Sequence, residues 1–442
     1  MSASIKLVVS TLLLSITFSA LSKSPIDIDA EFDQLENNQQ QLEQEYKDFA
    51  FAYMAEYETW RTEYLKEFDQ YRTEIISKWG SGEVSEKHKH VAYTEDKLRK
   101  AVIDYQNNEV TIAVLVDENT SKVESANEIK KAIKQLSTQK NSAIKEIAID
   151  KQPTAKNVET EKRNFSKKNE KQAKKVIIEQ TKQQLTEIDK ESDAIQLVKK
   201  DALSIDITAR VAAEKKKKLL NNAKTRLIKL KEQFAKQRQQ QASVAKKKIV
   251  KYTFSLPKNT LPTRAKTVVN MASQQADKWK ISPALIMAII HSESSFDPKA
   301  TSPIPAYGLM QIVPTTAGYD VNKLVRKINH PMSSAELYSP NINVETGSAY
   351  LNILDKRYLK LIKNDTARLY CMIAAYNTGA GNVARAFNPN RDRNINKAIK
   401  LINQKSPEEV YQQLLANLPY DETKHYLKKV TKRIGKYQPH FM

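Results

Sequence analysis

Glu293 ends an apolar pattern of the kind in which a glutamate can serve as a general acid. Ile286, Ile290 and Glu293 recur at the spacing of one helix face, and Ser282 and Pro283 are typical of a helix start. A carboxylate among apolar side chains is unfavourable unless it is paired or protonated, and desolvation raises the pKa of a carboxyl group. Glu293 is therefore a candidate general acid. The alternative is a solvent-facing glutamate in the last helical turn, which is the commoner situation for this residue type.

Four short motifs then follow one another in a fixed order. They are Glu293-Ser294 with Pro298, Gly308–Gln311, Ala375–Asn377, and Glu422-Thr423 with Tyr426. Each motif is weak alone, but four in order over about 130 residues are specific. With this pattern, residues 263–437 resemble the lytic murein transglycosylases of the goose-lysozyme-like superfamily.

The resemblance implies a lysozyme-like α-helical catalytic domain that acts on peptidoglycan. Ordinary glycosidases use two carboxylates, whereas this family is built on one, which is Glu293 here. Glu293 would protonate the oxygen of the β-1,4 bond between N-acetylmuramic acid (MurNAc) and N-acetylglucosamine (GlcNAc). It would then deprotonate the 6-hydroxyl group that closes a 1,6-anhydro ring. Asp297, Asp320 and Glu345 are the other nearby acidic residues, and none has a compelling context for a second carboxylate.

The resemblance also implies a set of substrate contacts, namely Ser302, Met310, Gln311, Tyr376, Asn377 and Tyr426. Ser302 matches a serine that orients the acetamido group, and the two amides could bind sugar hydroxyl or amide groups. The two tyrosines could hold the substrate or the catalytic glutamate. Core packing is the alternative role of the methionine and of Tyr376. Two alternatives to the transglycosylase stay open: a hydrolytic muramidase, and a scaffold that binds the cell wall without cleaving it.

Charge and the N-terminal residues predict the compartment and the partners. The net charge is +21, and residues 207–251 hold fifteen Lys and Arg against two Glu, which suits an anionic envelope surface but equally a solvated helix. The apolar run Leu7–Leu21 predicts a signal peptide that is cleaved after Ser22 and leads to the periplasm. Export argues against a nucleic-acid role. The single cysteine, Cys371, excludes an intramolecular disulfide, and no lipid-anchoring cysteine follows the signal.

Composition divides the chain into four parts of a mainly α protein. We expect a signal peptide (1–22), an N-terminal helical and α/β domain (23–119), a charged spacer (120–251) and the catalytic domain (252–442). The run at 110–116 is β-branched and apolar and predicts a buried strand. The spacer lacks glycine and favours helices, a coiled coil or partial disorder. His88 and His90 lack further ligands nearby, so we expect no metal site, and no cofactor is expected.

Overall fold

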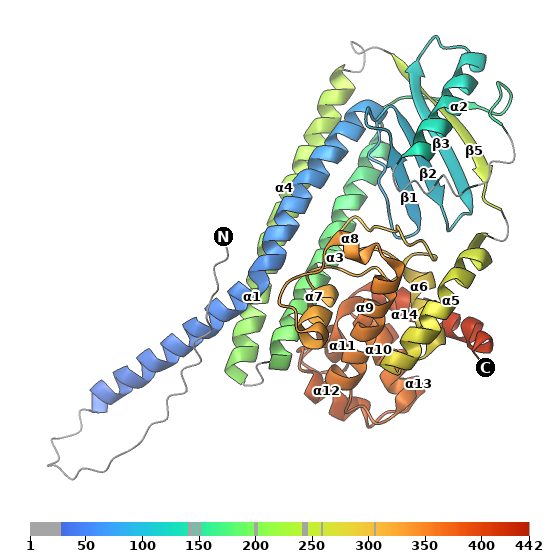
Figure 1. The fold of residues 1–442 in the computed structure, drawn as a ribbon. Helices are drawn as coiled ribbons and strands as arrows, with labels where there is room; N and C mark the ends of the chain where they lie inside the picture. Colours follow the sequence, from blue (N-terminus) through green and yellow to red (C-terminus); the bar gives the residue numbers. More distant parts are fainter. Residues whose placement is uncertain are drawn as a thin grey trace.

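The computed structural model describes residues 28–139, 144, 147, 152–198, 202–240, 246–257, 260–304 and 306–441. The signal peptide expected at 1–22 lies outside these residues. Three long helices run along one side of the molecule, a small sheet lies at one end, and a compact group of short helices forms the C-terminal part (Figure 1). The predicted mainly α class, with a small α/β part before an α-helical C-terminal domain, is confirmed.

The long helices are α1 (Ile28–Trp79), α3 (Lys167–Val198) and α4 (Ala202–Gln240). Apolar side chains at helical spacing hold them together, because Met54, Ile188 and Val211 share one buried cluster. Some of the basic side chains of α4 form ion pairs within this bundle. The Arg226 guanidinium donates two hydrogen bonds to Asp69 of α1, at 2.6 and 2.8 Å.

The sheet has five antiparallel strands in the order β1-β2-β3-β5-β4. The strands are β1 (Lys89–Tyr93), β2 (Arg99–Asp104), β3 (Glu109–Asp117), β4 (Glu159–Lys162) and β5 (Lys247–Ser255). Strand β3 confirms the buried strand predicted at 110–116, and α2 (Lys122–Thr138) covers it by packing Ile129 and Leu136 into the same core. Strand β4 and the first part of β5 (247–251) come from the segment expected to be a spacer, whereas the rest of β5 comes from the expected catalytic domain. Both segments therefore contribute to the sheet. The four-part division of the chain stays a prediction.

The C-terminal helices surround the largest apolar core of the described residues. They are α5 (Thr260–Trp279), α6 (Pro283–Glu293), α7 (Ala317–Val321), α8 (Ser334–Leu337), α9 (Pro340–Ile353), α10 (Asp365–Thr378), α11 (Ala380–Phe387), α12 (Ile395–Ile402), α13 (Pro407–Asn417) and α14 (Asp421–Tyr437). Helix α10 ends at Thr378, because Gly379 follows with a φ of +88° that favours glycine.

Helix α3 is fastened to the C-terminal helices by a buried charged cluster. The Gly381 amide, near the start of α11, donates to the Asp193 carboxylate at 2.8 Å, and Arg393 forms ion pairs with both Asp193 and Asp189. Asn382 donates to Asp189 at 3.1 Å. Because removing one partner of such a buried cluster leaves an uncompensated charge, these contacts fix α3 against the C-terminal domain.

Candidate active site

The local sequence places Glu293 at the buried end of α6. Ser282 caps this helix by accepting from the Leu285 amide, and Pro283 occupies a first-turn position where its missing N–H is not needed. All residues from Ala284 to Glu293 are buried, and Glu293 is only 3% exposed. The burial predicted from the apolar pattern is therefore found, and the solvent-facing alternative is wrong.

The turn after Glu293 is held in place by its neighbours. The Ser294 hydroxyl donates to the Ile290 carbonyl at 3.0 Å or to the Leu309 carbonyl at 2.9 Å, so it ties the helix end to the Gly308–Gln311 motif. Ser295 and Phe296 both adopt left-handed backbone conformations, with φ values of 51° and 65°. Such conformations are unfavourable for these residue types and persist only where the surroundings enforce them.

Five of the predicted site residues meet at one cavity of about 390 Å³, namely Glu293, Ser302, Gln311, Tyr376 and Asn377. The opposite wall comes from α3 and from the segment that leads into α14. These contributions are Glu179, Lys182, Gln183, Thr186, Glu187 and Lys190 from α3, and Pro419, Tyr420, Asp421, Glu422 and Thr423 from the second segment. The cavity therefore lies between the C-terminal helices and the long helix α3.

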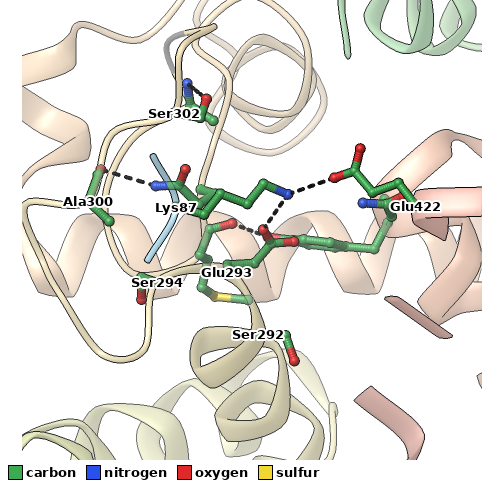
Figure 2. Close-up of polar contacts among 12 residues, drawn as sticks. Lys87, Ser292, Glu293, Ser294, Ala300, Ser302 and Glu422 are labelled. Carbon is green, nitrogen blue, oxygen red and sulfur yellow. Dashed lines mark hydrogen bonds and ion pairs between the residues drawn. The ribbon is translucent and has the colours of Figure 1, made fainter. Parts of the chain in front are cut away.

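An ammonium group bridges two carboxylates at the bottom of this cavity (Figure 2). Lys87 Nζ lies 3.2 Å from Glu293 Oε2 and 3.4 Å from Glu422 Oε1. Burial alone would lower the pKa of Lys87, but the charges of Glu293 and Glu422 raise it above its ordinary value. The arrangement thus keeps one cation beside the candidate general acid.

Two tyrosines lie behind Glu293. Burial, and then the Glu293 charge, raise the pKa values of both Tyr376 and Tyr426 well above the usual range, so both hydroxyls stay protonated. Tyr376 donates its hydroxyl to the Met310 carbonyl at 2.8 Å. A neutral hydroxyl beside a carboxylate can donate a hydrogen bond to it, which stabilises the ionised form.

Several predicted contact residues have partners within the protein. Ser302 donates its hydroxyl to the Ile304 carbonyl and accepts from the Ala306 amide, so it shapes the loop it belongs to. Gln311 Nε2 donates to the Ala300 carbonyl or the Gly308 carbonyl, each at 3.0 Å. The Gln311 Oε1 atom is buried and accepts no hydrogen bond within the described part of the chain. It therefore remains available as an acceptor.

The remaining predicted contacts differ in their placement. Asn377 accepts a hydrogen bond from the Thr423 hydroxyl at 2.7 Å, so it joins α10 to α14 at the cavity wall. Met310 is fully buried and packs against Gly347, where an added Cβ atom would lie 2.3 Å from the Met310 sulfur. Met310 and Tyr426 do not belong to the cavity lining; they support it from behind. A direct contact of either side chain with substrate stays a prediction.

Comparison with known proteins shows what the region around this site is similar to. Residues 270–399 match the family described as "Transglycosylase SLT domain". The C-terminal helices that contain this match are called the SLT domain below. The chain is 43% identical over 182 residues to membrane-bound lytic murein transglycosylase C of Serratia proteamaculans, covering 41% of this chain and 49% of that protein. The protein of the same name from Yersinia enterocolitica is 40% identical over 188 residues, covering 42% and 51%.

The chain thus spans about half the length of the curated relatives it matches. Among solved structures, it is similar to the 70 kDa soluble lytic transglycosylase of Escherichia coli, with 20% identity, 71% of this chain and 43% of that chain covered, and a TM-score of 0.30. The lytic transglycosylase Slt of Pseudomonas aeruginosa gives 25% identity over 39% of this chain and 24% of that chain, also with a TM-score of 0.30.

Two charged residues beside Glu293 are missing from the set predicted for the SLT domain. Glu422 belongs to the fourth motif, but sequence reasoning named Asp297, Asp320 and Glu345 as the nearby acidic candidates and found none compelling. The structure corrects this view, because Glu422 is the carboxylate that shares an ammonium with Glu293. No sequence signal points to Lys87, which lies about 200 residues before the SLT domain motifs.

Two further kinds of feature, a metal-ligand cluster and a membrane-spanning helix, concern all the described residues. Within the described ranges, no group of three or more His, Cys, Asp or Glu side chains could hold a metal ion. His88 instead shares a hydrogen bond of 3.0 Å with Ser295 at the turn after Glu293. No helix among the described residues is long and apolar enough to span a membrane.

Proposed function

We propose that this protein is a peptidoglycan lytic transglycosylase in which Glu293 is the single general acid and base. The observation that carries the proposal is the position of Glu293. It is a buried carboxylate at the end of α6, and it faces a cavity on the SLT domain. A water-poor site of this kind favours proton transfer over attack by bulk water. The bond cleaved is the β-1,4 bond between MurNAc and GlcNAc.

The reaction requires one proton to move out and one to return. Protonated Glu293 gives its proton to the glycosidic oxygen, and the bond between that oxygen and the MurNAc C1 breaks. The acetamido carbonyl of MurNAc stabilises the electron-poor C1, so no second protein carboxylate is needed. Ionised Glu293 then takes the proton of the MurNAc 6-hydroxyl, whose oxygen bonds to C1 and leaves a 1,6-anhydro end. Glu293 ends the cycle protonated.

The neighbouring residues have supporting roles in this proposal. Gln311 offers its buried acceptor Oε1 to an N–H or O–H group of the sugar. Asn377, joined to Thr423, borders the same space, and Ser302 holds the loop that the acetamido group would contact. Tyr426 stays neutral beside Glu293 and can donate its hydroxyl to the carboxylate between the two proton transfers, whereas Tyr376 donates its hydroxyl to the Met310 carbonyl.

A hydrolytic muramidase is the second candidate function, and the position of Glu422 is the observation that favours it. Glycoside hydrolases usually use two carboxylates that flank the bond they cleave. Glu422 lies close enough to Glu293 for both carboxylates to contact the Lys87 ammonium. In that case Glu422 would direct a water molecule, or attack C1 itself. A scaffold without catalysis is the third candidate, and the buried glutamate at position 293 argues against it.

Mass analysis of the products from purified peptidoglycan, digested by the full chain, separates these candidates. We expect muropeptides with 1,6-anhydro-MurNAc ends, each one water lighter than the reducing form. Reducing ends would support the muramidase. The Glu293→Gln variant should release no product, while Glu345→Gln, which changes a carboxylate paired with Lys278 outside the cavity lining, should act like the unmodified protein. Cleavage by Glu293→Gln would contradict the catalytic assignment.

We further propose that the protein works in the cell envelope, exported by the signal peptide at 1–22. The curated relatives are named membrane-bound enzymes, which supports this compartment. Exposed cations on α4 would contact anionic lipid, although Lys215 and Arg226 are already paired with Glu58 and Asp69. Sedimentation with anionic vesicles at low salt tests this contact, and equal sedimentation with neutral vesicles would refute it.

A further inference from the structure

The chain segment before β1 lies directly on the turn that follows Glu293. His88 Nδ1 is 3.0 Å from the Ser295 hydroxyl, and Lys87, one residue earlier, reaches past this turn to Glu293 and Glu422. Figure 2 shows the Lys87 side chain extending between the two carboxylates, with its backbone in a different ribbon from both. The N-terminal sheet therefore delivers a charged side chain into the cavity of the SLT domain.

The Lys87 contact is well defined by its surroundings. The side chains of Lys87 and Glu293 are 24% and 5% exposed, so water screens their 3.2 Å contact much less than it screens a surface ion pair. Glu422, on α14, is 45% exposed and holds the same ammonium from the solvent side. Lys87 thus has one buried and one exposed partner.

Lys87 also lies at the junction of two spaces. A groove of about 1,310 Å³ runs between the sheet and α3, and Lys87 and Glu422 line both this groove and the catalytic cavity. Glu179 and Gln183 of α3 also line both. A long polymer that occupied the groove and the cavity together would contact the Lys87 side chain, because this side chain borders both spaces.

The other charged and titratable groups around Glu293 lie on three elements. They are Tyr376 on α10, Asp421, Glu422, Tyr426 and Lys429 on α14, and Glu179, Lys182, Glu187 and Lys190 across the cavity on α3. Among the described residues, Lys87 is the cation in ion-pair contact with Glu293. An ammonium at this distance favours the ionised carboxylate, whereas the first step of cleavage needs the protonated one.

We propose that Lys87 is a positioning residue that occupies the Glu293 carboxylate in the empty enzyme and leaves it when a glycan strand enters. Cleavage is then coupled to occupancy of the cavity, because the glycosidic oxygen can reach the Glu293 carboxyl group only after Lys87 has moved away, with Glu422 remaining as the partner of the ammonium. This inference rests on the proposed function, since it assumes that Glu293 acts as the acid.

The pH dependence of cleavage tests the proposal with the full chain and a soluble, uncross-linked glycan strand of MurNAc-GlcNAc repeats. The profile of kcat/KM reports on the free enzyme, and that of kcat on the enzyme with bound substrate. In Lys87→Met, we expect the alkaline half-maximum of kcat/KM to move up by about 1 pH unit or more, because the paired charge is lost. The kcat profile should keep its position, since Lys87 no longer pairs with Glu293 in the complex.

Three further variants complete the test. Lys87→Arg keeps the charge and should keep the kcat/KM profile. Lys89→Met removes a charge two residues after Lys87, at the start of β1, and this charge pairs with Glu83 instead. The profile of Lys89→Met should therefore match that of the unmodified protein. Lys87→Gln is used if Lys87→Met does not fold. A folded Lys87→Met or Lys87→Gln variant with an unchanged kcat/KM profile, or an equal shift in Lys89→Met, would overturn the proposal.

The remaining outcomes separate this inference from the proposed function. If the kcat profile of Lys87→Met shifts as much as its kcat/KM profile, Lys87 stays paired with Glu293 in the enzyme–substrate complex. This result would refute the proposed displacement of Lys87. Cleavage by Glu293→Gln would instead remove the proposed function itself. If Glu293→Gln is inactive and the kcat/KM profile of Lys87→Met is unchanged, only the role of Lys87 is rejected and the proposed function stands.

Discussion

Replacing Gly381 by alanine should loosen α3 from the SLT domain. A Cβ atom at this position would lie 2.2 Å from Asp193 Oδ1 and 2.7 Å from Arg393 Nη2, inside the buried cluster that fastens the helix. Extra atoms in a packed interior cost about 1–3 kcal/mol. Alanine also gains about 0.5–1 kcal/mol over glycine within a helix. The net loss of α3 docking free energy should therefore be about 1–2 kcal/mol.

Hydrogen–deuterium exchange of the α3 backbone amides measures this loss. A destabilisation of about 1.4 kcal/mol raises the population of the undocked form, and so the exchange rate, about tenfold. Gly435→Ala is the matched control, because nothing lies within 4 Å of a Cβ atom at that position of α14. It should leave α3 exchange unchanged and slightly raise thermal stability. Since α3 is one wall of the catalytic cavity, Gly381→Ala should also raise KM for the glycan.

The result that would refute this reasoning is equal α3 exchange in Gly381→Ala and the unmodified protein. The mechanism itself is tested in an Asp193→Ala background, where the nearest contact of the new Cβ atom is absent. In that background, Gly381→Ala should lower the docking free energy of α3 much less, because the effects of substitutions at contacting residues are not additive. An undiminished loss in that background would show that the damage arises elsewhere in α11.

Further predictions concern titration and reactivity. Burial raises the pKa of Asp320 to about 7 from an unfolded value of 3.8, so the folded state binds more protons, and the Asp320 contribution to stability falls between about pH 4 and 7. Asp320→Asn should remove this fall, and a Tm difference between pH 5 and pH 8 that is the same in both proteins would contradict it. Burial lowers the pKa of His291 to about 3, so its contribution to stability is complete above about pH 6.5 and is lost as the pH falls toward 3. His291→Phe should therefore make the acid loss of Tm shallower, and an equally steep loss would contradict the assignment. Burial also raises the pKa of the Cys371 thiol, so iodoacetamide should label the unfolded chain much faster than the folded one; equal labelling rates would be inconsistent with that burial.

The SLT domain was predictable because its signals are local. Ser282 and Pro283 begin α6, Glu293 ends an apolar pattern, and Gly379 marks the end of α10. Each of these signals depends on neighbouring residues and on backbone geometry, so a single sequence carries them. The convergence of the motif residues on one cavity followed from the family resemblance rather than from the spacing.

The other half of the site depends on contacts between distant segments. Lys87 reaches Glu293 across more than 200 residues, and its neighbours in sequence carry no catalytic pattern. The strand β4 is exposed along its whole length, so it has no apolar alternation by which it could have been recognised. The sequence of α3 predicts only a charged helix. The structure shows that Asp189 and Asp193 contact buried partners on the SLT domain.

The order of the strands has a consequence for how the chain reaches this structure. Strand β5 lies between β3 and β4, yet it is the last of the five to be synthesised, after the whole α3–α4 hairpin. Until β5 emerges, β3 has an unpaired edge that includes residues 112–116, all of which are buried in the folded protein. Such exposed edges promote aggregation. Chains released before Lys247 should therefore associate through β3, whereas chains that extend beyond Ser255 can close the sheet first. The basic residues of the hairpin that precedes β5 should oppose this association, because like-charged chains repel one another.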